Sequence, residues 1–262
     1  MQLSGQVVVV TGGGNGIGAA MARRFAEEGP EAVVVADLDG DAAAAVADGI
    51  GARGVAVDVA DPAQVTELVE STKRDHGRID LFCANAGIGV FGGVEVPDED
   101  WQRSWDVNVM AHVYAARALL PDWLDQGTGY LLHTASAAGL LTNVGTAPYS
   151  VTKHAVVGLA EWLSMTHGDA GVRFSCLCPM GVRTNMLNAG RDVSAGAVVI
   201  SQGVIEPEDC AEAVVAGLAE ERFLILPHPE VAEFFQRKAA DHDRWLAGMR
   251  RLQASIEGGL SS

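Results

Sequence analysis

The sequence predicts an α/β fold, a doubly wound parallel sheet between layers of helices, and two observations support this prediction. Short apolar runs recur along the 262-residue chain, and longer amphipathic stretches separate them. The runs are apolar at consecutive positions, which is typical of strands buried on both faces of a parallel sheet. They lie at residues 6–11, 31–36, 53–57, 79–84, 129–134, 172–178 and 222–226. Alternation of strands with helices favours right-handed crossovers within one domain.

Helix boundaries are marked between these runs. Asp61 and Pro62 fit the N-cap and first position of a helix that reaches His76. Two further helices are expected to begin at Pro97 and Pro207, each followed by acidic residues. These segments supply the crossovers that parallel strands require.

Composition limits the class of protein. Hydrophobic residues make up 48% of the chain and charged residues 20%, which predicts a sizeable buried core. The formal net charge of −16 should repel nucleic acid, anionic membranes and an acidic carrier protein. No run of eighteen apolar residues occurs, and the N-terminus has no basic segment before its first apolar run. We therefore expect no membrane span, no signal peptide and no nucleic-acid partner.

The four cysteines are expected to be buried thiols. Cys83, Cys176, Cys178 and Cys210 are scattered and form no CxxC pair. Cys176 and Cys178 share one face of a predicted strand, without a histidine cluster nearby. We therefore predict no metal site and a cytoplasmic, reducing location.

A glycine-rich turn follows the first run. TGGGNGIG, from Thr11 to Gly18, stands between the first predicted strand and the helix AAMARRFAEEG. Glycines there allow a tight turn and let backbone N–H groups approach a pyrophosphate at the helix N-terminus. A flexible loop is the alternative, but the position between strand and helix indicates a dinucleotide site.

Asp37 indicates which dinucleotide is bound. It ends the second run, nineteen residues after Gly18, where a carboxylate can accept hydrogen bonds from the adenosine ribose hydroxyls. The same carboxylate would repel a 2′-phosphate, and no arginine or lysine lies in the turn or just after Asp37. We therefore predict NAD over NADP; the alternative is that Asp37 only caps the next segment.

Tyr149 and Lys153 lie four positions apart in the predicted helix APYSVTKHAVVGL. This spacing places both on one helical face, where such pairs are commonly mere surface contacts. A tyrosine with a pKa of about 10 needs a downward shift of roughly three units to act as a base near neutrality. A nearby cation supplies about one to three units, so Lys153 together with a nicotinamide cation could provide the shift.

Further motifs follow in order along the chain: CANAG with Asn85, DVNV with Asn108, HTAS with Ser136 and PMGVRT with Pro179. Together with the glycine turn and the Tyr149–Lys153 pair, their order and spacing over residues 5 to 227 resembles the short-chain dehydrogenase/reductase family. The resemblance implies a Rossmann-type, seven-stranded parallel sheet. It also implies hydride exchange between a nicotinamide and a carbonyl or alcohol.

The resemblance assigns roles by position. It makes Tyr149 the general acid/base, Lys153 the holder of the nicotinamide ribose that lowers the tyrosine pKa, and Ser136 the hydrogen-bond partner of the substrate oxygen. Asn108 would support a water-linked proton path through Lys153. The implied cofactor-binding residues are Gly12, Asn15, Gly16, Ile17, Gly18, Asp37, Leu38, Asp58, Val59, Asn85, Ala86, Gly87, Tyr149, Lys153, Pro179, Val182 and Thr184. Dimers or tetramers are common in the family, so a homo-oligomer is expected.

The substrate is expected to be a small, neutral and hydrophobic secondary alcohol or ketone. The resemblance places a substrate loop at about 179–206, where the stretch 185–205 carries only Arg191 and Asp192 as charges. Met180 stands where the family often has glycine, and it either shapes the substrate pocket or packs generically. Two alternatives stay open: a 3-oxoacyl or 3-hydroxyacyl thioester dehydrogenase/reductase, and a non-catalytic NAD-binding module.

The chain is expected to divide into a catalytic NAD-binding domain at 1–228 and a helical extension at 229–262. Residues 229–253 read as one long helix with an apolar face. That face either packs on the body of its own subunit or covers a pocket or a subunit interface.

Overall fold

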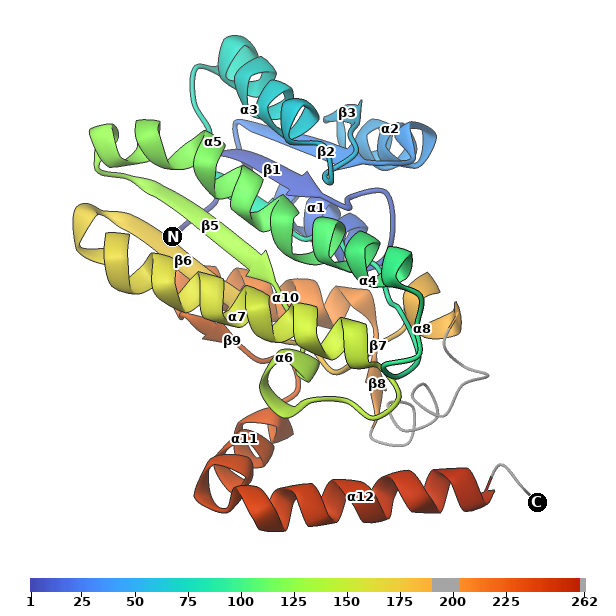
Figure 1. Ribbon diagram of the computed structural model, residues 1–262. Helices are drawn as coiled ribbons and strands as arrows, with labels where there is room; N and C mark the ends of the chain where they lie inside the picture. The colour runs from blue at the N-terminus through green and yellow to red at the C-terminus, as the bar shows by residue number, and fades with distance from the viewer. Residues whose placement is uncertain (190–202, 260–262) are drawn as a thin grey trace.

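The computed structural model describes residues 1–189 and 203–259, and its centre is a parallel sheet of seven strands (Figure 1). The strands run in the order β3-β2-β1-β4-β5-β6-β9. Their bounds are Val7–Thr11 (β1), Ala32–Asp37 (β2), Arg53–Ala56 (β3), Leu81–Ala84 (β4), Gly129–Thr134 (β5), Val172–Leu177 (β6) and Leu224–Ile225 (β9). All seven predicted runs are strands, and the order reverses between β1 and β4, which is where doubly wound sheets bind ligands.

The strands differ in burial according to their place in the sheet. Every residue of β1 is buried, as the run of four valines predicts for a central strand. In contrast, β3 alternates half-buried and exposed residues. The prediction that this run is buried on both faces was wrong, because β3 is an edge strand with a neighbour on one side only.

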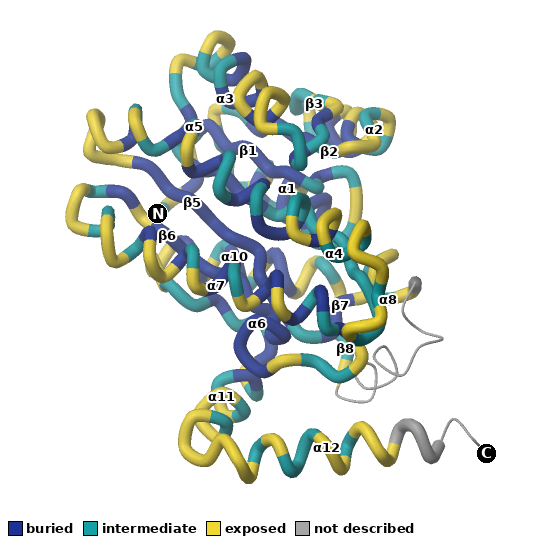
Figure 2. Tube along the Cα trace, viewed as in Figure 1, coloured by how far each residue is buried: buried dark blue, intermediate teal, exposed yellow. Residues whose placement is uncertain are grey.

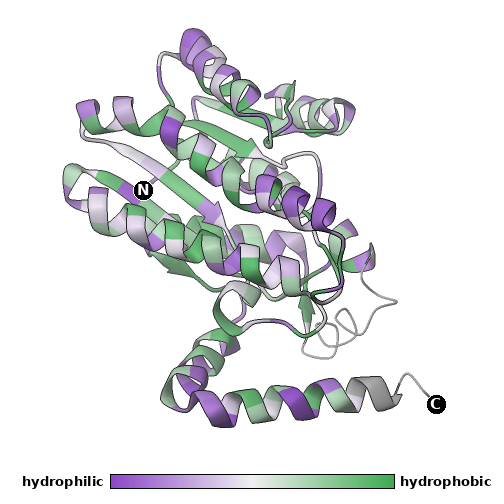
Figure 3. Ribbon diagram, viewed as in Figure 1, coloured by the Kyte–Doolittle hydropathy of each residue, from purple (hydrophilic) through white to green (hydrophobic). Residues whose placement is uncertain are grey.

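Helices cover both faces of the sheet (Figure 1). On one face, α1 (Gly16–Ala26), α2 (Gly40–Ile50) and α10 (Pro207–Ala219) share an apolar core with the strands. On the other face, α3 (Pro62–His76), α5 (Ala111–Gln126) and α7 (Ala147–His167) form a second core. Buried residues lie along the strands, and hydrophilic residues cluster on outer helices such as α3 (Figures 2 and 3). This pattern is the one that burial of apolar surface requires.

Local signals set the predicted helix starts. Asp61 caps α3 by accepting from the Ala63 N–H, with Pro62 at the first helical position. Helix α4 (Asp98–Trp105) begins directly after Pro97, and α10 begins at Pro207. A π-helical turn at Asp106–Met110 joins α4 to α5, and it holds Asn108.

The stretch 179–206 has structure of its own at its two ends. β7 (Gly181–Val182) pairs in parallel with β8 (Val204–Ile205), and α8 (Asn185–Ala189) follows β7. The substrate-loop prediction rested partly on Arg191 and Asp192, and both lie outside the described residues.

The C-terminal segment forms two helices, α11 (Glu230–Ala240) and α12 (His242–Gly259), so the prediction of one long helix was wrong. Asp241 adopts an extended backbone (φ −153°, ψ 91°), which ends α11 and turns the chain. In Figure 1, α12 runs below α6 (Ala138–Leu141), beyond the body of the sheet. The extension attaches through buried Val231 and half-buried Phe234 and Trp245, which pack with α6, α7 and β6.

The remaining regular element is a short 3₁₀ helix at Gly168–Ala170, between α7 and β6. Gly171 follows it with a positive φ of 89° and reverses the chain into β6. A Cβ at this position would lie 2.1 Å from the Gly127 oxygen, so only glycine fits the turn.

Candidate active site

A cavity of about 750 Å³ lies at the carboxyl ends of the strands. It extends from the glycine turn, past α7, to the C-terminal helices. Every residue assigned above to catalysis or cofactor binding lines it, except Asn108. Segments distant in sequence therefore meet at one site, at the edge of the sheet where the topology predicts ligand binding.

The glycine turn is fitted tightly against neighbouring backbone. Gly12 has a positive φ of 62°, and a Cβ on it would lie 2.8 Å from the Ala86 Cα. A Cβ on Gly18 would lie 2.0 Å from the Gly12 oxygen. The Asn85 amide donates to the Thr11 and Gly12 carbonyls at 3.0 and 3.3 Å, so it braces the turn. Side chains could not replace these glycines without moving the turn.

The first turn of α1 is open to an anion. Asn15 is its N-cap residue, yet its side chain makes no capping hydrogen bond to the helix. The first N–H groups of a helix lack intrahelical partners and carry the positive end of the dipole. This uncapped terminus, beside a turn that glycine keeps narrow, fits the pyrophosphate of a dinucleotide.

Asp37 is held in place by backbone N–H groups at the end of β2. Its Oδ2 accepts from Gly14 at 2.9 Å and its Oδ1 from Asp39 at 3.1 Å. The N-cap of α2 is Asp39, whose Oδ1 accepts from Asp41 and Ala42. The cap of α2 is therefore Asp39 and not Asp37, and Asp37 lines the cavity with Asp58.

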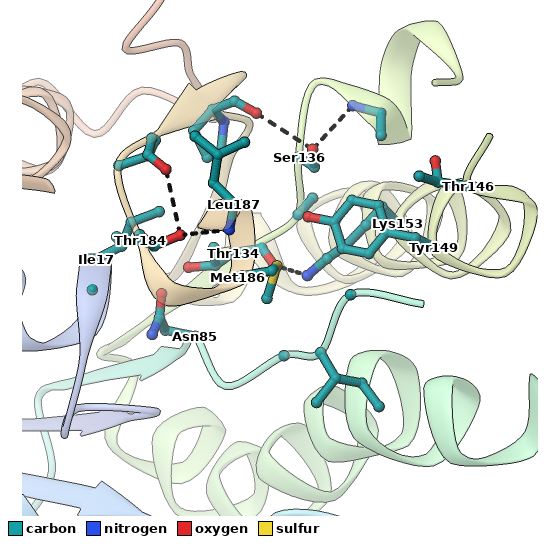
Figure 4. A pocket seen from close by; sticks show the side chains of 18 of the residues that line it. Ile17, Asn85, Thr134, Ser136, Thr146, Tyr149, Lys153, Thr184, Met186 and Leu187 are labelled. Atoms are coloured by element: carbon teal, nitrogen blue, oxygen red, sulfur yellow. Dashed lines mark hydrogen bonds between the residues drawn. The ribbon is translucent and has the colours of Figure 1, made fainter. Parts of the chain in front are cut away.

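Ser136, Tyr149 and Lys153 meet in the middle of the cavity (Figure 4). Ser136 follows β5, and its Oγ accepts from the Ala138 N–H at 3.1 Å. Lys153 is buried, and its Nζ donates to the Thr134 carbonyl at 2.9 Å. The same Nζ lies 5.6 Å from the centre of the Tyr149 ring. The helical spacing of four thus brings the ammonium and the phenol together inside the cavity.

Burial dominates the proton affinities of this pair. It raises the pKa of Tyr149 above its ordinary value, and a hydrogen bond with Ser136 acts against that rise. Burial also lowers the pKa of Lys153 to about 8. In the protein alone the net shift of the Tyr149 pKa is therefore upward, because the loss of solvation outweighs the hydrogen bond. The role assigned to Lys153, which is to lower the tyrosine pKa together with a nicotinamide cation, stays a prediction.

Asn108 lies behind the cavity wall. It is fully buried in the π-helical turn, and it exchanges two hydrogen bonds with the backbone of Ile88. A Cβ placed on Gly87 would come within 3.4 Å of both the Asn108 Oδ1 and the Lys153 Nζ. Asn108 is thus a neighbour of Lys153 that fixes the loop after β4.

His228 is a residue of the site that the sequence reasoning missed. Its Nδ1 accepts from the Met180 N–H at 3.2 Å, and its Nε2 lies 3.1 Å from the Gly181 carbonyl. These partners require a neutral ring that carries its proton on Nε2. Burial lowers the pKa of His228, which favours that neutral form. Met180 lines the cavity, so its backbone position depends on a histidine 48 residues later.

The C-terminal helices supply a wall of the cavity. Phe234 and Arg237 of α11 and Trp245 and Met249 of α12 line it. The apolar face of the segment was recognised from sequence, but only the break at Asp241 turns α12 toward the cavity. Phe234 and Trp245 pack on the body of their own subunit and also line the cavity. The two alternatives considered for the apolar face, packing on the subunit and covering a pocket, therefore hold together.

Other chemistry is limited within residues 1–189 and 203–259. No group of three histidine, cysteine or acidic side chains there could hold a metal ion. No helix in those ranges is long and apolar enough to cross a membrane. All four cysteines are buried and free, and burial raises the pKa of Cys83 well above its ordinary value.

Comparisons with known proteins agree with this geometry. The pattern of the short chain dehydrogenase family matches residues 6–194. A 1-deoxy-11-beta-hydroxypentalenate dehydrogenase of Streptomyces exfoliatus is 37% identical over 88% of this chain and 86% of that protein. A meso-2,3-butanediol dehydrogenase of Serratia marcescens is 38% identical over 84% of this chain and 90% of that protein.

A solved structure extends the agreement to the fold. A short chain dehydrogenase/reductase from Burkholderia phymatum, in complex with NAD, superimposes with a TM-score of 0.84 and 32% identity. The match covers 93% of this chain and 96% of that one. The chain therefore belongs to the short chain dehydrogenase family, whose members are oxidoreductases that use a nicotinamide cofactor.

Proposed function

We propose that the chain is an NAD-dependent alcohol dehydrogenase that interconverts a secondary alcohol and its ketone. The observation that carries the proposal is the meeting of Ser136, Tyr149 and Lys153 in a cavity that also contains the glycine turn. A non-catalytic NAD-binding module would have no use for a phenol and a buried ammonium at the same point. The related dehydrogenases that act on hydroxyl compounds support the same reaction class.

In the oxidative direction, the Tyr149 phenolate accepts the hydroxyl proton while the carbinol carbon loses a hydride. A bound oxidised nicotinamide would supply the acceptor for that hydride. Ser136 donates a hydrogen bond to the substrate oxygen and keeps it against Tyr149. A role as nucleophile is disfavoured, because no basic residue adjoins Ser136 in the sequence. Reduction reverses each transfer, with Tyr149 returning the proton to the oxygen.

Lys153 stabilises the phenolate as a cation held beside the ring. Burial opposes ionisation of Tyr149, so the positive charge of an oxidised cofactor is needed in addition. Asn108 acts as a positioning residue. It fixes the backbone at Ile88 beside Lys153 and so keeps a path by which the proton leaves through water.

Asp37 and Asp58 support NAD over its phosphorylated form. Both carboxylates line the cavity near the glycine turn. Among the described residues that line the cavity, the cationic side chains are Arg103, Lys153 and Arg237, none of them in the turn or after β2. A 2′-phosphate would therefore meet negative charge without a compensating arginine.

The substrate that we propose is small enough for the cavity, neutral and hydrophobic. Phe91, Leu141 and Met186 line the cavity around Ser136 and Tyr149. No carboxylate lines it there among the described residues. A net charge of −16 also disfavours docking of an acidic acyl carrier protein, which speaks against the acyl thioester alternative.

We also propose a cytoplasmic homo-oligomer, a dimer or tetramer. Four free thiols fit a reducing compartment. Trp105 of α4 and Val151 and Met165 of α7 are exposed apolar side chains that a second subunit would cover. Light scattering of the NAD-bound protein tests this, and a monomeric mass would exclude it.

Kinetics of the Tyr149→Phe variant test the reaction. Hydrophobic secondary alcohols are offered with NAD or NADP, and nicotinamide absorbance is followed. The wild type should prefer NAD, and the variant should lose about 10²- to 10⁴-fold in kcat because it lacks the proton acceptor. NADH fluorescence should still report binding to the variant. Turnover near the wild-type rate, or a preference for NADP, would contradict the assignment.

A further inference from the structure

Two hydrogen-bond donors lie together in the cavity wall that the extension supplies. Arg237 and Trp245 both line the cavity and both contact Phe234. The Arg237 Cζ lies 5.8 Å from the centre of the Phe234 ring, and the Trp245 ring centre lies 6.4 Å from it. They belong to one patch, which we call the donor wall: Phe234, Arg237, Trp245 and Met249.

The Trp245 indole N–H is an unused donor. It is shielded from solvent and has no hydrogen-bond partner in the described part of the chain. An indole nitrogen can only donate, so no alternative proton position satisfies it. Leaving such a group unpaired and buried costs free energy, and an acceptor placed there recovers it.

Arg237 is a second donor that can be redirected. Its ion pair is with Glu233 at 3.1 Å, and both side chains are about two-thirds exposed. Exposed ion pairs of this kind contribute little to the free energy of folding. Arg237 can therefore leave Glu233 and bind another acceptor at little cost in free energy. Phe234 meanwhile holds the guanidinium beside the cavity by a cation–π contact.

The donor wall has donors and no strong acceptor. Arginine and tryptophan only donate, while phenylalanine and the methionine thioether offer at most a weak acceptor. The wall also lies outside residues 6–194, which the family pattern covers. It is therefore suited to recognising something particular to this chain's substrate rather than the shared cofactor.

We propose that the donor wall binds a hydrogen-bond-accepting oxygen at the end of the substrate remote from the carbinol carbon. The inference rests on the proposed function. It changes the proposed substrate class from neutral alcohols in general to hydrophobic secondary alcohols that carry a second oxygen, either in a neutral carbonyl or in a carboxylate. A carbonyl oxygen pairs with the Trp245 N–H, and a carboxylate pairs with Arg237. Trp245 is only half-buried, so its ring can turn and bring the N–H, which is shielded in the free protein, to the ligand.

Matched alcohols test the proposal. Three steroid alcohols share one ring skeleton and differ at the carbon farthest from the carbinol, which bears a ketone, a carboxylate or only hydrogen. Three decalin alcohols repeat the series on a shorter skeleton. The measured quantity is the ratio of kcat/KM for each oxygenated alcohol to that for its hydrocarbon parent. In the wild type, at least one ratio should be about 10, the value expected for one hydrogen bond to a buried donor.

Two variants assign the donor. Trp245→Phe keeps an aromatic side chain without the N–H and should bring the ketone ratio to about 1. Arg237→Gln should do the same for the carboxylate ratio. Trp162→Phe on α7 and Arg250→Gln on α12 are the matched controls, since neither residue lines the cavity, and they should keep the wild-type ratios.

The outcomes separate the two proposals. Ratios near 1 for both skeletons in the wild type, or raised ratios that survive both variants, overturn the donor wall while leaving the dehydrogenase intact. If no alcohol in either series is oxidised, the proposed function fails for this class. In that case the Kd of each corresponding ketone is measured with the NADH-loaded protein. The ratio of the Kd of the hydrocarbon parent to the Kd of its oxygenated partner then decides whether the donor wall prefers an oxygen.

Discussion

The two ends of the cavity differ in the atoms that form their walls. At the cofactor end, main-chain atoms pack against main-chain atoms, and a single added Cβ on Gly12 or Gly18 would collide with them. At the outer end, the wall consists of large side chains on two helices. Phe234 and Trp245 remain only half-buried there.

The difference shows how one chain can hold a cofactor fixed while its substrate range varies. An added Cβ on Gly12 or Gly18 would lie under 3 Å from main-chain atoms, so these two positions of the turn leave no room for a side chain. Half-buried side chains on two helices that lie beyond the sheet can be exchanged without disturbing it. We therefore expect substitutions at the two ends to differ in size and in the quantity that they alter.

The largest effect is expected at Gly18. Gly18→Ala adds a Cβ that would lie 2.0 Å from the Gly12 oxygen and 2.6 Å from the Asn85 amide nitrogen. Relieving such overlap costs about 1–3 kcal/mol, so the Kd for NADH should rise by about 10- to 100-fold. NADH fluorescence titration measures it.

Gly49→Ala is the matched control, because a Cβ there meets nothing within 4 Å and the residue lies in α2. It should leave NADH affinity unchanged and stabilise the protein by about 0.5–1 kcal/mol. Equal Kd values for the two variants would mean that the cofactor end is not built on backbone contact.

The sequence predicted the cofactor end well because its signals are local. A glycine turn between a valine run and a helix, and a carboxylate after the next run, each follow from a few neighbouring residues. The seven strands were found for the same reason, since burial on both faces leaves a consecutive apolar pattern. The edge strands β3 and β9 are less buried than this pattern predicts.

The outer end could not be predicted because its contacts join residues far apart in the chain. His228 holds the backbone at Met180, and Lys238 donates to the Leu140 carbonyl 98 positions away. Asp241 caps α12, since its Oδ1 accepts from the Arg244 N–H at 2.9 Å, but one aspartate in a segment rich in charged residues is too weak a signal to predict a break between two helices. The direction of α12, and hence the place of Trp245 in the cavity, depends on that break.

A smaller effect is expected at Phe234, on the outer wall. Phe234→Ala removes the ring that Arg237 and Trp245 both contact. Because a large apolar side chain contributes about 1.5–3 kcal/mol when fully buried, a half-buried one should change kcat/KM for bulky alcohols by about 10-fold. Steady-state kinetics with a bulky and a small secondary alcohol measure how far the change in kcat/KM differs between the two.

The neighbouring Phe235→Ala is the control, since Phe235 is 40% exposed and does not line the cavity. Its kinetics should match the wild type for both alcohols. If Phe234→Ala instead weakened NADH binding, the outer wall and the cofactor end of the cavity would not be independent of each other.

The smallest effect concerns the pH dependence of stability at His228, which holds the backbone at Met180 and Gly181. Burial lowers its pKa, and its Nδ1 must stay unprotonated to accept from Met180. Below the unfolded pKa of about 6.5, the unfolded chain binds more protons than the folded one. The free energy of unfolding should therefore fall as pH falls toward the folded pKa, by at most about 1.4 kcal/mol per pH unit for this group.

Urea unfolding at pH 7, 6 and 5 measures that slope. His228→Gln lacks the titrating ring, so its slope should be shallower than that of the wild type. Some slope will remain, because burial lowers the pKa of His112 and His133 as well. His242→Gln, at an exposed position, should keep the wild-type slope. Identical slopes in all three proteins would mean that protonation of His228 does not weaken its hold on Met180.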